Sequence, residues 1–164
     1  MKINQSVLIM GVSGAGKTTI GSVLAKRTKS IFIDADNFHS SDNIKKMRSG
    51  LPLNDEDRLN WLIKIKSEIV KNLKKNNVII ACSALKKKYR DYLNIGNLKI
   101  VFLKIDKQTA ITRIKNRNNH FMPVSLLEDQ FKILSQPKNA IICDAKKEKC
   151  ETINFLLDNL NFIN

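Results

Sequence analysis

Residues 11–18 read GVSGAGKT, which completes the pattern G-x-x-x-x-G-K-S/T of a phosphate-binding loop. Glycines let such a loop wrap a phosphate so that successive backbone N–H groups point inward, and the helix expected near Lys17 adds the partial positive charge of its N-terminus. Lys17 would reach the β- and γ-phosphates of a nucleotide, and Thr18 would place its hydroxyl on Mg²⁺. The segment predicts ATP or GTP binding by Gly11, Val12, Ser13, Gly14, Ala15, Gly16, Lys17 and Thr18.

Two carboxylates, Asp34 and Asp36, follow the predicted strand Ile31–Ile33. Side chains alternate along a strand, so the pair is expected on one face, beside the phosphate-binding loop if the first and second strands lie near each other. A kinase needs a carboxylate that accepts the proton of the acceptor hydroxyl, and oxygen ligands or waters that complete the Mg²⁺ shell. Asp36 suits the first task and Asp34 the second, through water. A turn-capping role is the alternative.

The segment CSALKKKYRD follows the third predicted strand. Ser83 stands where that strand gives way to a helix, and Lys86 and Arg90 are four residues apart on one face of the helix. These hydroxyl, ammonium and guanidinium groups would suit an acidic or polyhydroxylated acceptor. Alternatively, Ser83 only caps the helix and the two basic side chains meet water. No Asp follows this strand, so the hydrolytic carboxylate of a motor protein is absent.

A predicted helix carries Arg113 and Arg117 at the edge of its apolar stripe and leads to a polar break that contains Pro123. Arginines in this place can swing over bound ATP and stabilise charge on the transferring phosphoryl group. The break, about residues 113–125, is predicted to be a mobile lid. Two exposed helix arginines without such a role are the alternative.

The elements that must position these residues alternate between strands and helices. One long helix is predicted after Pro52, with Asn54 as its N-cap and with Trp61, Leu62, Ile65, Ile69 and Leu73 at helical spacing on its apolar face. Alternation of this kind predicts an α/β fold with a parallel sheet flanked by helices on both sides. Ligands of such sheets gather beyond the carboxyl ends of the strands, where every motif above falls. The short β-rich runs are Val7–Met10, Ile31–Ile33, Val78–Cys82, Ile100–Leu103 and Ala140–Cys143.

Composition narrows the class of protein. The chain has 164 residues and shows no repeat or linker, which predicts a single domain over residues 1–164. Its net charge of +14 comes from scattered lysines with no basic run interleaved with aromatic residues, so no nucleic-acid partner is predicted. No apolar run approaches the length of a membrane span, and three cysteines without C-x-x-C spacing predict reduced thiols in the cytoplasm.

Taken together, the motifs resemble those of the small P-loop gluconokinases. The matching pieces are GVSGAGKTT, DADNFH, NIKKMRSGLPLNDEDRLNWL, CSALKKKYRD and RNNHFMPVSLLEDQF, which cover most of residues 5–137 in the order of the family. The resemblance implies ATP-dependent phosphorylation of D-gluconate at its 6-hydroxyl, which gives 6-phosphogluconate. It also implies the three-layer α/β/α fold of nucleoside monophosphate and shikimate kinases, with five parallel strands, and a homodimer.

The resemblance also assigns site residues. By this resemblance, Asp36 corresponds to the catalytic base near the gluconate 6-hydroxyl, and Arg113 and Arg117 correspond to the lid arginines of the family. His120 belongs to a lid segment in which the family usually has a glycine before the histidine, whereas this chain has Asn119; His120 is either a lid packing residue or a ligand. The groups expected around the sugar acid, one arginine of which would pair with its carboxylate, are His39, Arg58, Lys86 and Arg90.

Three other classes predict different features. A shikimate kinase would carry a run of glycines after the third strand, where this chain has Cys82, Ser83 and Ala84. A GTPase would carry a guanine-binding N/T-K-x-D motif late in the chain, and none is found. A basic nucleotide-gated module would bind oligonucleotides in a salt-sensitive manner and would consume ATP without a sugar acid. Another small acidic acceptor, such as a different aldonic acid, is the alternative substrate.

Overall fold

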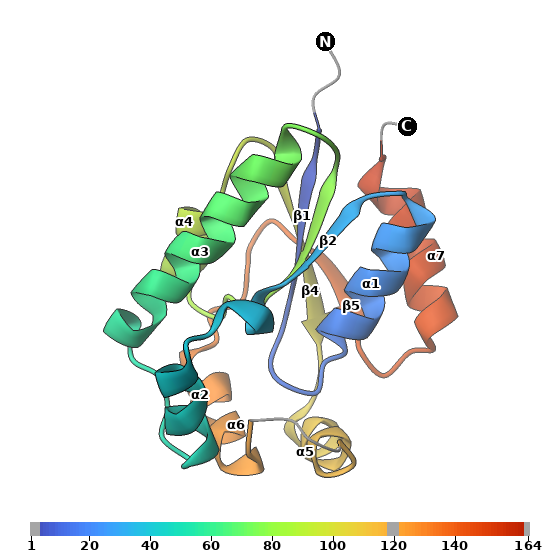
Figure 1. Ribbon diagram of the computed structural model, residues 1–164. Coiled ribbons are helices and arrows are strands. Elements are labelled where there is room, and N and C mark those ends of the chain that lie inside the picture. The colour runs from blue at the N-terminus through green and yellow to red at the C-terminus, as the bar shows by residue number, and fades with distance from the viewer. Residues whose placement is uncertain (1–3, 118–121, 163–164) are drawn as a thin grey trace.

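The computed structural model describes residues 4–117 and 122–162 and places five strands in one sheet between two layers of helices (Figure 1). The strands are β1 Ser6–Met10, β2 Ile31–Asp34, β3 Val78–Ala81, β4 Leu98–Lys104 and β5 Ile141–Asp144. The α-helices are α1 Lys17–Arg27, α2 Ser41–Arg48, α3 Asp55–Leu73, α4 Lys87–Leu93, α5 Lys107–Lys115, α6 Leu127–Ile133 and α7 Lys149–Leu160. Two short 3₁₀ helices, η1 Ala35–Phe38 and η2 Val124–Leu126, complete the fold.

All strand pairs in the sheet are parallel, and their order is β2-β3-β1-β4-β5. This confirms the predicted fold class. The strands thus end at the same edge of the sheet, and Figure 1 shows α2, α5 and α6 gathered at that edge, away from the two chain termini. The first and second strands are not neighbours, because β3 lies between them.

The two faces of the sheet are covered by different helices (Figure 1). Alternate residues of β1 point to opposite sides: Val7 and Ile9 pack with α1 and α7, whereas Leu8 and Met10 pack with α3 and α4. These strand residues are at most 1% exposed, so both faces contribute to a dry core. The β-rich runs of the sequence have no polar alternation for this reason.

Helix α3 begins where the sequence predicts it. Asn54 is the N-cap: its side chain accepts a hydrogen bond from the Asp57 N–H, while the Asp57 carboxylate accepts one from the Asn54 N–H, which completes a capping box. Trp61, Leu62, Ile65 and Ile69 are buried against the sheet, as their spacing predicts. The capping box fixes the first turn of α3, and this turn carries Arg58 toward the functional site.

Candidate functional site

The phosphate-binding loop connects β1 to α1 and is held against α5. Gly14 has φ +85°, and a Cβ there would lie 2.9 Å from the Ala110 carbonyl oxygen, so only glycine fits this close approach. Gly16 also has a positive φ and is the N-cap of α1, which begins at Lys17. The backbone N–H groups of the first turn of α1 therefore lie next to the loop, where the sequence predicts bound phosphate.

Lys17 is the residue at which this loop joins α1. Its ammonium donates a hydrogen bond to the Val12 carbonyl oxygen at 3.0 Å. Burial lowers the pKa of Lys17, and the nearby positive charge of Arg117 acts in the same direction, whereas the negative charges of Asp36 and Asp34 raise it. The carboxylates are thus close enough to Lys17 to act on its charge.

Thr18 and the two predicted carboxylates form a connected set. The Thr18 hydroxyl donates to one oxygen of the Asp34 carboxylate at 2.8 Å, and the other oxygen accepts from the Asp36 N–H at 3.1 Å. The expectation that Asp36 continues the alternation of the strand is wrong, because β2 ends at Asp34 and Asp36 lies in η1. Asp34 instead caps this 3₁₀ turn, as the turn-capping alternative predicts. Both Asp34 and Asp36 nevertheless line one cavity with Ser13, Lys17 and Thr18 of the loop.

A cavity beside the loop gathers most of the predicted acceptor side chains. Asp36 and Lys17 line it together with His39, Arg58 and Ser83. The cavity lies beyond the ends of β2 and β3. Because β3 lies between β1 and β2 in the sheet, Ser83, which follows β3, lines this cavity. Ser83 does not cap the following helix, because α4 begins at Lys87 and its N-cap is Lys86.

His39 forms one wall of the cavity and stacks on Trp61, with ring centroids 4.6 Å apart and 5° between the planes. Burial lowers the pKa of His39 to about 4; the charge of Asp36 opposes this shift and that of Arg58 adds to it. The imidazole is therefore neutral near pH 7 and can both donate and accept a hydrogen bond.

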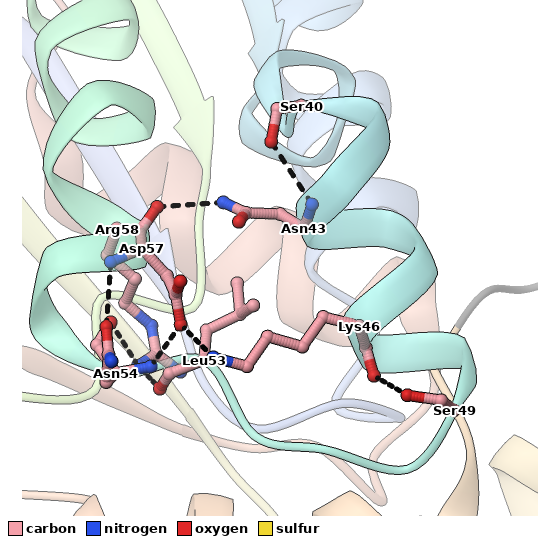
Figure 2. Close-up of polar contacts among 8 residues, drawn as sticks. All are labelled: Ser40, Asn43, Lys46, Ser49, Leu53, Asn54, Asp57 and Arg58. Carbon is pink, nitrogen blue, oxygen red and sulfur yellow. Dashed lines mark hydrogen bonds and ion pairs between the residues drawn. The ribbon is translucent and has the colours of Figure 1, made fainter.

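Arg58 lines the cavity from the first turn of α3, and helix α2 holds that turn through contacts with Asp57 (Figure 2). The Asn43 side-chain amide donates to the Asp57 carbonyl oxygen at 2.8 Å, and the Lys46 ammonium pairs with the Asp57 carboxylate at 2.6 Å. The Arg58 guanidinium itself donates to the Leu53 carbonyl oxygen. Two side chains of α2, Asn43 and Lys46, thus hold Asp57 in the first turn of α3 (Figure 2).

Two predicted acceptor residues lie outside this cavity. The Lys86 ammonium bonds to the Asp55 carboxylate at 2.8 Å, and Lys88 and the Tyr89 hydroxyl also donate to Asp55. These hydrogen bonds, that from Lys86 first, hold the pKa of the Asp55 carboxyl well below its usual range. Asp55 therefore joins the starts of α3 and α4, and Lys86 is a partner in that contact rather than a side chain of the cavity.

Arg90 is likewise a structural residue in this conformation. It is 5% exposed, and its guanidinium donates to the carbonyl oxygens of Ala84, Leu85 and Ser135 at 2.8–2.9 Å. Ala84 has φ +38°, an uncommon conformation for a residue with a Cβ, and it follows Ser83 directly. Arg90 does not line the acceptor-side cavity as predicted, because the carbonyl oxygens of the turn after β3 point into the protein and the buried guanidinium donates hydrogen bonds to them.

The two arginines predicted to belong to the lid have different surroundings. The Arg113 guanidinium donates to the carbonyl oxygens of Gly14, at 3.2 Å, and Ala145, at 2.7 Å, which connects the phosphate-binding loop to the segment after β5. Arg117 is exposed and lines both the acceptor-side cavity and a second cavity of about 410 Å³. His120 lies outside the described residues.

That second cavity lies on the other side of the phosphate-binding loop and includes residues that sequence analysis missed. Its walls are Gly14–Gly16, Arg113, Arg117 and the segment 145–149, which reads AKKEK. The segment follows the last strand of the sheet, so the rule that ligands gather at carboxyl ends of strands would have pointed to it. The cavity can hold the base and ribose of a nucleotide whose phosphates lie in the loop.

Gln130 was also missed. It comes from α6, and its side-chain carbonyl accepts a hydrogen bond from the Ser13 N–H at 2.7 Å. Ser13 is the third residue of the phosphate-binding loop, and both residues line the acceptor-side cavity. No local pattern marks Gln130, because the contact joins residues 117 positions apart in the chain.

The oxygen pair of Thr18 and Asp34 is the arrangement in this site that suits a hard cation such as Mg²⁺, which takes few protein ligands and completes its shell with water and phosphate. In the described part of the chain, no three His, Cys, Asp or Glu side chains are grouped to hold a metal. The Thr18 hydroxyl and the Asp34 carboxylate fit an ion that takes its remaining ligands from a nucleotide and water.

Comparison with known proteins places these features in context. A model of the family described as shikimate kinase matches residues 13–156. The thermosensitive gluconokinase of Escherichia coli is 46% identical over 137 residues, which are 82% of this chain and 73% of that protein. An unliganded sugar kinase from a Janibacter species superposes with TM-score 0.89 at 37% identity, over 97% of this chain and 95% of that chain. A gluconokinase from Sinorhizobium meliloti superposes with TM-score 0.80 at 34% identity, over 98% and 97%.

Proposed function

Because the chain belongs to the gluconokinases, within the shikimate kinase family of P-loop kinases, we propose that it transfers the γ-phosphoryl group of ATP to the 6-hydroxyl of D-gluconate. The product is 6-phospho-D-gluconate. One observation in the molecule carries the proposal: Thr18 of the phosphate-binding loop, Asp34 and Asp36 are joined by hydrogen bonds and line the same cavity as Arg58 and His39. An acceptor in this cavity lies between a base and a bound phosphate.

Asp36 is proposed as the general base. Its carboxylate would accept the proton of the 6-hydroxyl as the phosphoryl group arrives, which requires hydrogen-bond reach and a fixed orientation. The N–H of Asp36 is bonded to the Asp34 carboxylate, so the backbone of the base is held at the end of β2. Holding reactants in this way accounts for much of the rate acceleration in phosphoryl transfer.

Charge that develops on the phosphoryl group is matched by cations from two sides. Lys17 and Arg117 both line the acceptor-side cavity, and Arg117 also lines the second cavity, so we propose that both contact the phosphates. Preorganised cations in a site with little water stabilise this charge strongly. Arg113 is proposed to lie closer than Arg117 to the base and ribose of the nucleotide, because its guanidinium bonds to Gly14 and Ala145, which line the second cavity.

The acceptor end of the cavity suits a polyhydroxylated acid. The half-buried Arg58 guanidinium is proposed to pair with the carboxylate of gluconate, for which its planar fork is well shaped. Neutral His39 and the Ser83 hydroxyl are proposed to bind sugar hydroxyls, since both can donate and accept hydrogen bonds. Lys86 and Arg90 are left out of this set because neither side chain lines the cavity, whereas Arg58 does.

Thr18 and Asp34 are proposed to hold Mg²⁺, Thr18 directly and Asp34 through water, which agrees with the 2.8 Å contact between their oxygens. When bound, the ion would supply positive charge that offsets the charge of the nucleotide phosphates. The chain's own contribution is to orient the two oxygens: Thr18 is fixed by the first turn of α1, and Asp34 by its bond to the Asp36 N–H.

A lid over residues 113–125 is proposed to close the site. The space inside the acceptor-side cavity is about 60 Å³, room for a few water molecules, so a six-carbon acid can enter only if the walls move apart. One wall includes Met47, Leu53 and Met122, which form with Leu126 a small apolar cluster separate from both faces of the core. This cluster joins the end of α2 to Met122 within the proposed lid and to Leu126 just after it, and its methionines can repack as the wall moves.

The test is an ATP-consumption assay with gluconate, other aldonic acids, shikimate and nucleoside monophosphates as acceptors, in which we expect the highest kcat/KM with gluconate. Higher activity with another aldonic acid would support the alternative acceptor class, and preference for shikimate would contradict the assignment. The absence of a glycine run after β3, where Cys82, Ser83 and Ala84 stand, argues against shikimate. ATP consumption that no acceptor stimulates, with salt-sensitive binding to an oligonucleotide, would instead support a nucleic-acid-binding module.

We further propose a homodimer in the cytoplasm, as the resemblance to the family implies. In the described ranges Cys82, Cys143 and Cys150 carry free thiols, which suits a reducing compartment. No helix of residues 4–117 or 122–162 is long and apolar enough to cross a membrane. Sedimentation of the purified protein tests the dimer, with a monomer at all concentrations as the contrary result.

A further inference from the structure

Trp61 is the only tryptophan of the chain, and it has two contacts with the segment that carries the proposed base. The indole N–H donates to the Ala35 carbonyl oxygen at 2.7 Å. The indole ring stacks on His39, four residues further along the same segment. Trp61 is 3% exposed and belongs to the core on the α3 face, yet it also lines the acceptor-side cavity.

The contact with Ala35 acts directly on Asp36, because the Ala35 carbonyl and the Asp36 N–H belong to one peptide group. Trp61 holds the carbonyl side of this planar unit, and the Asp34 carboxylate holds the N–H side at 3.1 Å. Asp34 is bonded in turn to Thr18 of the phosphate-binding loop. A continuous set of hydrogen bonds thus runs from the phosphate-binding loop through the peptide group of the base to α3.

The segment needs this support. Helix η1 has only four residues, and short 3₁₀ turns have weak hydrogen-bond geometry of their own. Ala35 is fully buried, so without the indole its carbonyl oxygen would lose a partner that water cannot readily replace. At the far end of the segment, His39 has its ring orientation set by the nearly parallel stack on Trp61.

We propose that Trp61 is the positioning residue of the acceptor site: its N–H sets the orientation of Asp36, and its ring sets that of His39. The inference rests on the proposed gluconate kinase function. A tryptophan that only fills the core would also satisfy its N–H when buried, but its loss would lower stability without a specific effect on kcat or on the KM for the acceptor. The two roles therefore differ in a measurable way.

Two substitutions separate the two contacts. Trp61→Phe keeps an aromatic ring beside His39 but removes the N–H, so we expect kcat to fall about tenfold with the KM for gluconate changed less than about twofold. Trp61→Leu removes both contacts, so we expect the same loss of kcat together with a KM for gluconate raised about tenfold. The KM for ATP should stay within about twofold of the wild-type value in both, because Trp61 lies on the acceptor side.

Ile65→Val is the matched control. Ile65 is on the same helix, is fully buried in the same part of the core and does not line the cavity. This variant should lower the unfolding temperature while kcat stays at the wild-type value. Wild-type kcat in Trp61→Phe, or an equal loss of kcat in Ile65→Val, would overturn the inference.

Tryptophan fluorescence gives a second readout on the unmodified protein, since Trp61 is the sole tryptophan. Titration with gluconate should change its emission in a saturable manner, and an emission that gluconate leaves unchanged would contradict the placement of Trp61 at the acceptor. Wild-type protein that consumes no ATP with gluconate would refute the proposed function instead. The variants would then be compared on whichever acceptor the wild type phosphorylates, so the two failures are distinguishable.

Discussion

Acidification should destabilise the folded protein through His39. Burial lowers the pKa of His39 from 6.5 to about 4 in the folded protein. In the unfolded chain the imidazole has its ordinary pKa, so between these values the unfolded state binds a proton that the folded state does not. The free energy of unfolding therefore falls as pH falls through this window, and it is unaffected by His39 above it.

The size of the effect follows from the two pKa values. They differ by about 2.5, and each pH unit within the window corresponds to about 1.36 kcal/mol, which gives a total loss of about 3 kcal/mol. For a chain of 164 residues this loss lowers the midpoint of thermal unfolding by roughly 10 °C.

The assay is urea unfolding of the wild type and of His39→Gln at a series of pH values from about 7 to about 4. Glutamine keeps a neutral polar group but does not titrate, so the variant removes the contribution of His39 while the carboxyl groups titrate equally in both proteins. As pH is lowered, we expect the free energy of unfolding of the wild type to fall more steeply than that of His39→Gln, by about 1.36 kcal/mol per pH unit. Parallel curves for the two proteins would refute the argument that His39 is buried in its neutral form.

Three further substitutions test the phosphate side and the proposed base. Asp36→Asn should lower kcat about 10²- to 10⁴-fold with the Kd for ATP nearly unchanged, since an amide cannot accept the proton; a variant that kept most of its activity would exclude Asp36 as the base. Lys17→Ala should weaken ATP binding in calorimetry and lower kcat about 10²-fold, because it removes a cation from the phosphates; wild-type values for both would contradict the role of the loop. Gln130→Met removes the acceptor of the Ser13 N–H and should raise the KM for ATP about fivefold, whereas Lys132→Met, an exposed change on the same helix, should leave it unchanged.

Local signals in the sequence were sufficient for the elements and for the parts of the site that depend on short segments. The phosphate-binding loop combines glycines with a lysine and a threonine at fixed spacing, and the loop is positioned between β1 and α1 as predicted. The start of α3 was predictable because a capping box involves residues only three apart. Continuous apolar runs identified all five strands to within a few residues, since strands covered on both faces need apolar side chains throughout.

Predictions failed where a side chain's direction depends on contacts distant in sequence. Helical spacing put Lys86 and Arg90 on one face but gave no indication that Asp55, 31 residues earlier, binds the first. Helical spacing also gave no indication that the carbonyl oxygen of Ser135, 45 residues later, accepts a hydrogen bond from Arg90. Strand alternation failed at Asp36 because Asp34 caps a 3₁₀ turn there and ends the strand.

The sequence by itself determined the chemistry of this protein: a loop that holds phosphate, carboxylates that follow the second strand, and the order of strands and helices, all of which depend on residues close together in the chain. Only the tertiary structure decided which side chains meet. It placed β3 between β1 and β2, brought Trp61 of α3 onto the peptide group of Asp36, and brought Gln130 of α6 onto the phosphate-binding loop. The physical reason is that parallel strands are joined by crossovers, so the packing of distant helices over the strand ends, which no local pattern encodes, selects the neighbours of each functional group.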